Sequence, residues 1–317
     1  MRALITGGGF VGQWLARELL ARRAEVHVAG LSSSSDATVL TADERAAVHW
    51  TVADFRDTAA VDRAVEASQP DAVFHLAGVS FPPQAEREPE AAYEVNVLGA
   101  VRLLEAVERR RTAGQLDPVV LVVGSSVEYG RHAAEAMPLP ETAELRPSSV
   151  YGATKVAQEI ASLQAFRRTG MRVICTRSFN HSGVGHAPQY LLPSLVSRAR
   201  RISSGAEKSL SIGNDAVRDY LHVSDVVSAY LSLIERGHAG EVYNVASGQG
   251  VSTHQLANDV LLRAGTAAEI LTEPALVRAS DIPTLIGSPA KLQRDTGWQP
   301  TKTYADIIDD LLHAEAD

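Results

Sequence analysis

Short apolar runs alternate with stretches of helical periodicity through the first 177 residues of the chain. Apolar residues spaced three and four apart predict amphipathic helices, whereas continuous apolar runs are typical of strands buried on both faces of a parallel sheet. Residues 119–123, which are all apolar and end at Gly124, form the clearest run of the second kind. This alternation predicts βαβ units with right-handed crossovers. The expected strands are 2–6, 25–29, 71–76, 119–123 and 171–176, and the expected helices follow the first glycine turn or cover 59–67, 90–111 and 150–168.

The pattern changes beyond Arg177, where residues 178–215 are rich in Gly, Ser, Pro and His. Ser252 has capping-box spacing at the start of a helical pattern. Further helices are expected near 191–202, 224–236 and 304–314, with a strand at 241–245 and a largely irregular segment at 274–289. The predicted fold is α/β: a Rossmann-type, doubly wound parallel sheet with a smaller C-terminal α/β substrate lobe. The predicted division is 1–177 plus 214–246 for the dinucleotide-binding domain and 178–213 plus 247–317 for the lobe.

Composition excludes several classes of protein. The 317 residues are 45% hydrophobic and 21% charged, with a formal net charge of −8 and one cysteine. Disordered chains have lower apolar content, and one cysteine cannot form an internal disulfide. An acidic chain is unsuited to broad binding of nucleic acid, and no apolar run has the length of about 18 residues that a membrane span needs. The first seven residues do not resemble a signal peptide, so we expect a soluble, cytoplasmic protein without nucleic-acid or membrane partners.

A glycine-rich turn follows the first predicted strand. The segment from Gly7 to Gly12 matches G-x-G-x-x-G between a strand and a helix. Glycines allow a tight turn and close backbone approach to a pyrophosphate, which then faces the helix N-terminus. The turn therefore predicts dinucleotide binding rather than a purely structural turn, with contacts from Gly7, Gly9, Phe10, Val11 and Gly12.

The end of the second predicted strand bears on the choice of dinucleotide. An acid at this place would bind the adenosine 2′-hydroxyl of NAD and repel a 2′-phosphate. The chain instead has serines, including Ser32 and Ser33, and no arginine that could hold the phosphate. The absence of an acid favours NADP(H), whereas the absence of an arginine leaves NAD(H) possible; the alternative is that the serines form a solvated loop.

Tyr151 and Lys155 lie four residues apart on a predicted helix and therefore share a face. A nearby ammonium favours the phenolate and lowers the pKa of the tyrosine. Because the chain has eight tyrosines and only four lysines, such a pair would arise by chance about 0.1 times. Ser125, at the carboxyl end of the 119–123 strand, offers a hydroxyl for a carbonyl oxygen, or alternatively caps the strand end.

These features together resemble the extended short-chain dehydrogenase/reductase family over nearly the whole chain. The resemblance implies that Tyr151 is the acid/base, that Lys155 activates it and binds the nicotinamide ribose, and that Ser125 is the third catalytic residue. It also implies that Asp54 contacts the adenine. The glycine turn departs from the family pattern, because most extended members have one more residue between the first two motif glycines. The remaining cofactor contacts expected from the resemblance are Phe55, Leu76, Ala77 and Gly78.

Segments of the second half resemble those of family members that act on GDP-linked 6-deoxyhexoses. They are residues 177–186, 217–227, 242–248 and 278–288, and the last most resembles reductases of GDP-4-keto-6-deoxy-D-mannose. Ser178, Val184 and His186 depart from the pattern of those enzymes, which places sugar and base specificity in question. Asn180, Arg218 and Arg278 are implied to hold the diphosphate and nearby groups, since arginine forks match phosphate oxygens. The full expected substrate set is Ser126, Glu128, Asn180, Arg218, Arg278 and Asp281.

One position distinguishes reduction from dehydration. Related 4,6-dehydratases carry a carboxylate two residues after the catalytic hydroxyl, where this chain has Val127. Glu128 is adjacent, but strand alternation would direct it away. The expected reaction is therefore NAD(P)H-dependent reduction of the C4 ketone of a nucleotide-linked 4-keto-6-deoxyhexose. The expected product is GDP-D-rhamnose, or its C4 epimer GDP-6-deoxy-talose, from GDP-4-keto-6-deoxy-D-mannose.

Two other functions remain open: a nucleotide-sugar 4-epimerase that holds NAD tightly, and a non-enzymatic NADP-binding sensor, which would commonly lack the Tyr/Lys pair. No metal site is expected, because His181 and His186 have no acid or cysteine at ligand spacing. Cys175 lies in an apolar strand and is expected to be an inert core residue. The resemblance also implies a homodimer that pairs through the helices near 90–111 and 150–168.

Overall fold

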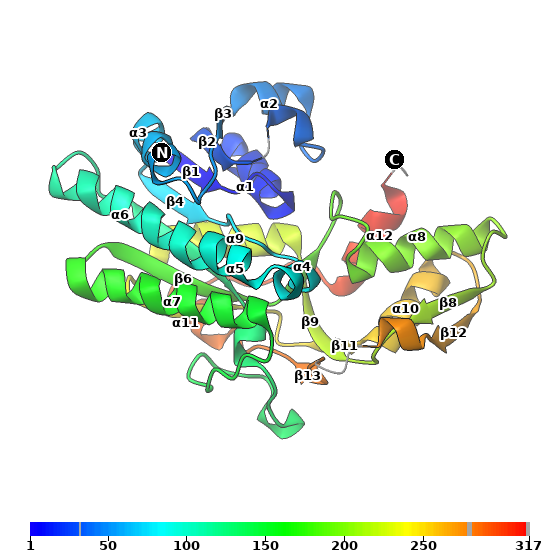
Figure 1. Cartoon of the computed structure of the whole chain (residues 1–317). Coiled ribbons are helices and arrows are strands. Elements are labelled where there is room, and N and C mark those ends of the chain that lie inside the picture. The colour runs from blue at the N-terminus through cyan, green and yellow to red at the C-terminus, as the bar shows by residue number, and fades with distance from the viewer. Residues whose placement is uncertain (32, 278–280, 315–317) are drawn as a thin grey trace.

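A computed structural model of the chain describes residues 1–31, 33–277 and 281–314. Its largest sheet has seven parallel strands in the order β10-β6-β5-β4-β1-β2-β3 (Figure 1). The order reverses direction between β1 and β4, as expected for a doubly wound sheet. The predicted fold class is therefore confirmed. The strands are β1 (Arg2–Thr6), β2 (Glu25–Gly30), β3 (His49–Val52), β4 (Ala72–His75), β5 (Val119–Ser125), β6 (Arg172–Ser178) and β10 (Val242–Val245).

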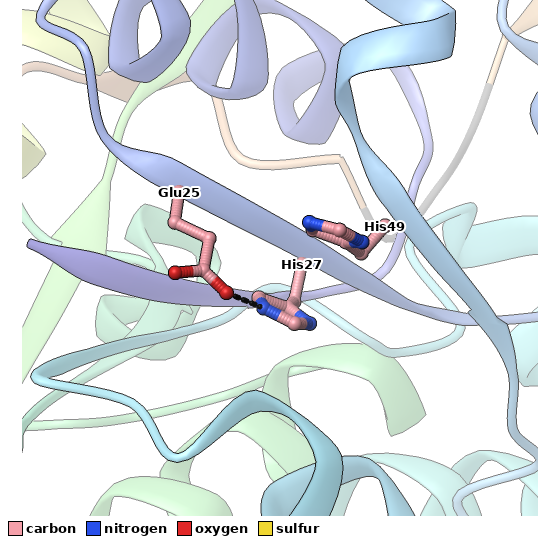
Figure 2. A group of neighbouring side chains, drawn as sticks. All are labelled: Glu25, His27 and His49. Carbon is pink, nitrogen blue, oxygen red and sulfur yellow. Dashed lines mark hydrogen bonds and ion pairs between the residues drawn. The ribbon is translucent and has the colours of Figure 1, made fainter.

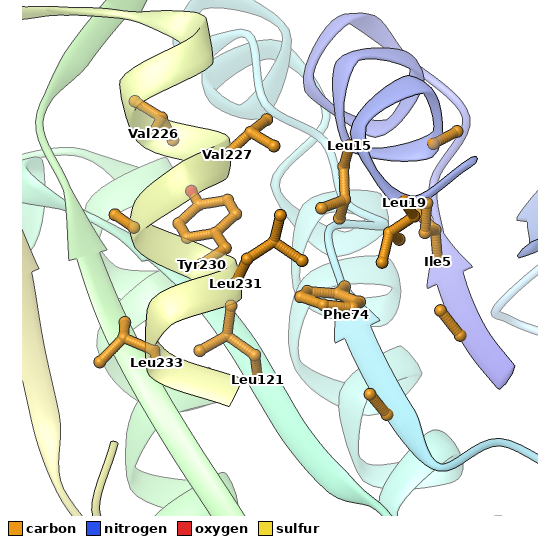
Figure 3. Packing of buried hydrophobic residues seen from close by; sticks show 14 of the residues in the cluster. Ile5, Leu15, Leu19, Phe74, Leu121, Val226, Val227, Tyr230, Leu231 and Leu233 are labelled. Carbon is orange, nitrogen blue, oxygen red and sulfur yellow. The ribbon is translucent and has the colours of Figure 1, made fainter. Parts of the chain in front are cut away.

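Helices cover both faces of this sheet, because its strands are apolar on both sides. One face carries α1 (Phe10–Ala21), α9 (Val223–Arg236) and α11 (Ala290–Thr296), and the other carries α3 (Thr58–Ser68), α6 (Gly99–Thr112) and α7 (Val150–Thr169). Figure 3 shows side chains of α1 and α9 meeting over the strands, with Phe74 of β4 and Leu121 of β5 beneath them. Between β2 and β3 lies the short helix α2 (Ala42–Ala47), and α4 (Pro82–Arg87) and α5 (Pro89–Tyr93) follow β4.

The long helix predicted at 90–111 is divided by a π-helical turn at Glu94–Leu98. Such turns occur mostly as single insertions within α-helices and are frequent at functional sites. Here the turn buries the Asn96 side chain, which bonds both backbone groups of Val79 and the Thr154 hydroxyl. Arg109, Arg110 and Arg111 occupy the last turn of α6, where the helix dipole favours positive charge.

The second half of the chain builds a smaller lobe around its own apolar cluster (Figure 1). One small sheet contains β7 (Asn180–Ser182), β9 (Val217–His222), β11 (Gly250–Ser252) and β13 (Thr284–Leu285), and a two-stranded sheet pairs β8 (Ser209–Ile212) with β12 (Glu269–Thr272). The helices of the lobe are α8 (Leu191–Ser203), α10 (Thr253–Arg263) and α12 (Tyr304–His313). Leu292 and Trp298 pack into the core of the large sheet, although the sequence-based division assigns 247–317 to the lobe.

A buried carboxylate joins the C-terminal segment to α9. Asp225, 2% exposed, accepts hydrogen bonds from the amide and hydroxyl of Thr301 and from the amide of Lys302.

Among the described residues, no helix is long and apolar enough to cross a bilayer.

Asp225→Ala is expected to lower the free energy of unfolding by about 3 kcal/mol, because two backbone amides and a hydroxyl lose their acceptor. Urea unfolding of the full chain measures the change. Asp43→Ala, on the exposed side of α2, is the matched control and should remain within about 0.5 kcal/mol of the parent. A loss below about 1 kcal/mol at Asp225 would contradict this account.

Candidate functional site

The predicted cofactor contacts gather at the carboxyl ends of the parallel strands. Gly7 follows β1 with φ +91°, and a Cβ there would lie 2.9 Å from the Ala77 amide nitrogen after β4. Gly12 packs so closely that a Cβ would lie 2.1 Å from the Gly7 carbonyl oxygen. A Cβ on Gly9, by contrast, would meet no atom within 4 Å. Two glycines thus shape the turn, and the third leaves open space before α1.

This arrangement suits a pyrophosphate. Helix α1 begins with Gly9 as its N-cap, which makes no side-chain capping bond, and its first turn carries no acid. The amides at the start of a helix and its dipole together favour an anion. Gly78, after β4, lies beside α7, since a Cβ on it would be 3.7 Å from Lys155 Nζ. The residues of the turn therefore fit a dinucleotide.

The structure gives the other cofactor candidates more specific surroundings. The Asp54 carboxylate receives the Arg56 guanidinium, with a shortest contact of 2.6 Å. Phe55 is 4% exposed, and its ring lies 5.7 Å from that of His75. The Ser33 amide and hydroxyl both donate to Asp36. Ser32 lies outside the described residues.

Ser125, Tyr151 and Lys155 come together as predicted. Ser125 ends β5, and its side chain is a hydrogen-bond partner of the Tyr151 phenol at the start of α7. Lys155, one turn further along α7, is 5% exposed, and its Nζ donates to the Val123 carbonyl and to Gln158 Oε1, both at 2.9 Å. Burial lowers the pKa of Lys155 to about 8, although the Glu128 carboxyl opposes the shift.

The pKa of Tyr151 shifts in the direction opposite to the sequence-based expectation. Burial raises it above the ordinary value, the Ser125 hydrogen bond opposes this, and the Glu128 carboxyl adds to it. The phenol therefore holds its proton at neutral pH, which is the form that can donate to a carbonyl oxygen.

Glu128 does not take the position expected of a substrate contact. Residues 126–129 form a 3₁₀ turn rather than a strand extension, so strand alternation does not apply. The Glu128 side chain is fully buried, and its Oε1 accepts from the Ser125 amide at 2.6 Å. Burial and the neighbouring Glu159 raise the pKa of Glu128 to about 8. The Glu128 carboxyl therefore contacts the Ser125 backbone instead of an open surface. Ser126, 2% exposed, is also buried.

Arg177 neutralises this buried region. Its guanidinium makes a two-bonded pair with Glu159 on α7, at 2.8 and 2.9 Å, and donates to the Tyr129 hydroxyl and the Glu141 carbonyl. It also lies over the Tyr129 ring, 4.9 Å from the centroid. Cys175 on β6 is buried nearby, and burial raises the pKa of its thiol, as an inert core residue requires.

The predicted substrate residues of the second lobe lie in its β7/β9 sheet. Arg218 on β9 pairs with Asp281 at 2.5 Å, so the structure brings two members of the set together. Asn180 on β7 is in register with Tyr220 and bonds its hydroxyl. Arg278 lies outside the described residues. Ser125 at the end of β5 is in register with Ser178 on β6, and Asn180 follows Ser178 by two residues, so the lobe sheet begins close to the end of β5.

A loop of the second lobe lies against the glycine turn. The His186 ring stacks on Phe10 at 4.6 Å and on Tyr190 at 4.2 Å, and Tyr190 makes an edge contact with Phe81. A Cβ on Gly185 would lie 2.3 Å from Val39 Cγ2. These four residues (Phe10, His186, Tyr190 and Phe81) form an aromatic column, in which burial lowers the pKa of His186 to about 3.

Four polar residues of the site region were not found from the sequence. Asn96 and Gln158 hold groups beside the reactive centre, and Glu159 balances Arg177. Asp219, within the predicted 217–227 segment, accepts bonds from Ser247 and the Gly248 amide and thereby fixes a loop of the lobe. Of the four, only Gln158 could have been found from the sequence, because it lies three residues after Lys155 and therefore on the same face of the helix.

Taken together, the sheet, glycine turn and Ser/Tyr/Lys group define a dinucleotide-dependent oxidoreductase of the short-chain dehydrogenase/reductase type. The family model described as GDP-mannose 4,6 dehydratase matches residues 4–311, and the chain belongs to this family. Its members include NAD(P)-dependent nucleotide-sugar reductases, epimerases and dehydratases, and the chain is such an enzyme.

Three similar proteins illustrate the reductases and epimerases that resemble this chain. GDP-6-deoxy-D-mannose reductase of Pseudomonas aeruginosa is 37% identical over 245 residues, covering 77% of this chain and 79% of the relative. The structure of RMD from Pseudomonas aeruginosa complexed with NADPH is 30% identical, with a TM-score of 0.81 and 98% of each chain covered. A Thermus thermophilus UDP-glucose 4-epimerase complex with NAD is 28% identical, with a TM-score of 0.83 and coverage of 99% and 100%.

Gln158→Leu is expected to lower kcat/KM about tenfold and to move the basic limb of its pH profile to lower pH. The substitution removes one of the two acceptors of the Lys155 ammonium, so the lysine loses its proton more readily. The measurement is a pH–rate profile. The control is Gln164→Leu, exposed on the same helix, which should leave the profile unchanged; equal profiles for the two variants would refute the role of Gln158.

Proposed function

We propose that the enzyme reduces the C4 ketone of a nucleotide-linked 4-keto-6-deoxyhexose, with GDP-4-keto-6-deoxy-D-mannose as substrate and GDP-D-rhamnose or its C4 epimer as product. The observation that carries this proposal is the proton-holding Tyr151 phenol, bonded to Ser125 and one helical turn from Lys155. Ketone reduction needs a proton donor and a hydroxyl that orients the carbonyl, and these groups supply both. The similarity to a GDP-6-deoxy-D-mannose reductase supports the same reaction.

In this proposal Tyr151 Oη donates its proton to O4 of the sugar as that oxygen gains negative charge. Ser125 Oγ holds O4 in place, and the Lys155 ammonium stabilises the phenolate that remains. The bonds from Lys155 to Val123 and Gln158 keep that ammonium against the strand end. A bound reduced nicotinamide supplies the hydride. The glycine turn would hold its pyrophosphate, and Asp54 and Ser33 lie at the strand ends where its adenosine half belongs.

NADP(H) is the favoured cofactor because no acid stands directly at the end of β2. Asp36 lies slightly further along the chain, and its carboxylate already accepts hydrogen bonds from the Ser33 amide and hydroxyl. The NADPH complex of the similar Pseudomonas protein supports this preference.

The proposal disfavours dehydration. Val127, at the position of the dehydratase carboxylate, cannot move a proton. The adjacent Glu128 is fully buried and bonded to the Ser125 amide, so it does not replace the missing base. Arg218 and Asn180 would receive the nucleotide diphosphate, with Arg218 oriented by Asp281.

Tyr151→Phe is expected to lower turnover of the keto-sugar by roughly 10²–10⁴-fold while NADPH binding is kept, since only the proton donor is lost. NADPH consumption and fluorescence titration of NADPH measure the two quantities. Tyr304→Phe, whose hydroxyl bonds Asp259 in the lobe, is the control and should turn over normally. Full activity of Tyr151→Phe would exclude this residue as the acid.

A substrate panel tests the reaction itself. GDP-mannose with a 4,6-dehydratase supplies the keto-sugar, and other nucleotide 4-keto-sugars are compared with it. Stoichiometric loss of NADPH, with assignment of the product at C4, supports the reductase. Interconversion of C4 epimers with tightly held NAD and no net NADPH loss would instead identify a 4-epimerase, and binding without any turnover would identify a sensor.

The proposed homodimer pairs α6 and α7, which run side by side in Figure 1 and contact each other. Three large apolar side chains on this part of the molecule are exposed: Tyr93, Leu98 and Ile160, at 43%, 44% and 58%. A partner subunit would remove them from water.

Ile160→Asp is therefore expected to convert a dimer to a monomer, because a carboxylate would be buried without a partner. Sedimentation or light scattering measures the mass. Leu262→Asp, at an even more exposed apolar residue (76%) on α10, is the control and should keep the mass of the parent. A parent chain that is already monomeric would refute the pairing.

A further inference from the structure

Three potential metal ligands meet on one face of the large sheet, away from the catalytic groups. Glu25 and His27 are two residues apart on β2 and therefore point to the same face. His49 on β3 is in register with His27. Each residue offers one ligand atom, and these atoms all lie within 4.8 Å of one another. Figure 2 shows the two imidazole rings one over the other, with the Glu25 carboxylate beside His27.

We propose that Glu25, His27 and His49 bind a transition-metal ion, with Zn²⁺ as the preferred ion. Two imidazoles and one carboxylate form a donor set that zinc accepts, with water in the remaining position. Imidazole ligands favour zinc over Mg²⁺ and Ca²⁺, which prefer oxygen ligands. This site is independent of the proposed sugar chemistry.

The three ligand atoms lie within 4.8 Å of one another, and a tetrahedral ion would draw them closer together. Metal–ligand distances of about 2.0–2.1 Å place two ligand atoms about 3.3 Å apart. His27 Nε2 and Glu25 Oε1 are 2.9 Å apart, and the two rings are 4.6 Å apart at an interplanar angle of 23°. Rotation of the exposed His49 side chain toward the Glu25 end of the stack is the main adjustment needed. The ion would then replace the shared proton of the His27–Glu25 hydrogen bond.

Burial and charge around the cluster also favour binding. His27 is 8% exposed, so the sheet holds one ligand in place, while Glu25 and His49 are exposed and leave access for the ion and its water. Arg2, in register with Glu25 on β1, is paired with Asp71 at 3.7 Å, which offsets its repulsion of a cation. No metal site was expected from His181 and His186; this cluster is a different one, and His49 joins Glu25 and His27 only through the pairing of β2 with β3.

The position of the site indicates its effect. β3 is the edge strand of the seven-stranded sheet, and His49 is its first residue. An ion here would link the edge strand to β2 at the amino ends of the strands, whereas Ser125 and the glycine turn lie at the carboxyl ends. Zinc is therefore expected to stabilise the fold without changing catalysis.

The test is titration of ZnCl₂ into the full chain without an affinity tag, followed by calorimetry, with thermal unfolding in parallel. One zinc per chain is expected, with a higher unfolding temperature. His49→Ala and Glu25→Gln are each expected to weaken binding at least tenfold and to remove the thermal shift. His254→Ala, an exposed histidine on α10, is the matched control and should bind zinc like the parent.

Each other result contradicts the site. Absence of stoichiometric binding in the parent overturns it, as does equal loss of binding in His254→Ala. An equal thermal shift with MgCl₂ would show that charge alone acts at this surface, rather than imidazole ligation. Unchanged binding in both His49→Ala and Glu25→Gln would place the ion elsewhere.

Discussion

The reactive centre depends on a guanidinium buried between β6 and α7. Arg177 joins Glu159 of α7 to the Tyr129 hydroxyl that follows β5, and it also reaches the Glu141 carbonyl in the next loop. Removing either partner of such a buried pair would leave an uncompensated charge, which costs several kcal/mol. The pair thus fixes the helix that carries Tyr151 and Lys155 against the strand that carries Ser125. The placement of Ser125, Tyr151 and Lys155 thus depends on this buried ion pair as well as on the three side chains themselves.

The same region contains more ionisable groups than the reaction uses. Glu128 and Lys155 are both buried, and burial moves their pKa values toward each other, to about 8 in each case. Two buried groups of opposite charge stabilise each other's ionised forms, and both also accept or donate bonds that fix the end of β5. The environment of Lys155 is therefore set by buried neighbours, which are Glu128, Gln158 and the Val123 carbonyl.

The sequence predicted the parallel sheet well, because continuous apolar runs mark its buried strands and apolar residues three and four apart mark the helices between them. It also located Ser125, Tyr151 and Lys155, whose spacing reports directly on one helix and one strand end. It could not predict the π-helical turn that buries Asn96, since one extra residue in a helix leaves no mark in a hydrophobic pattern. The burial of the Glu128 side chain was missed for a related reason. Residues 126–129 form a 3₁₀ turn, in which side chains do not alternate between two faces as they do in a strand.

The aromatic column at the glycine turn has a mechanical consequence. His186 is stacked between Phe10, on the first helix of the sheet domain, and Tyr190, on the loop that leads into α8. The loop cannot withdraw from the turn without breaking the stack, and Phe10 cannot rotate without displacing the loop. Each aromatic pair of this kind contributes about 0.5–1.5 kcal/mol beyond its buried area. The stacked rings therefore join the two halves of the chain beside the glycine turn, and any separation of the halves at this place would have to break the His186 contacts.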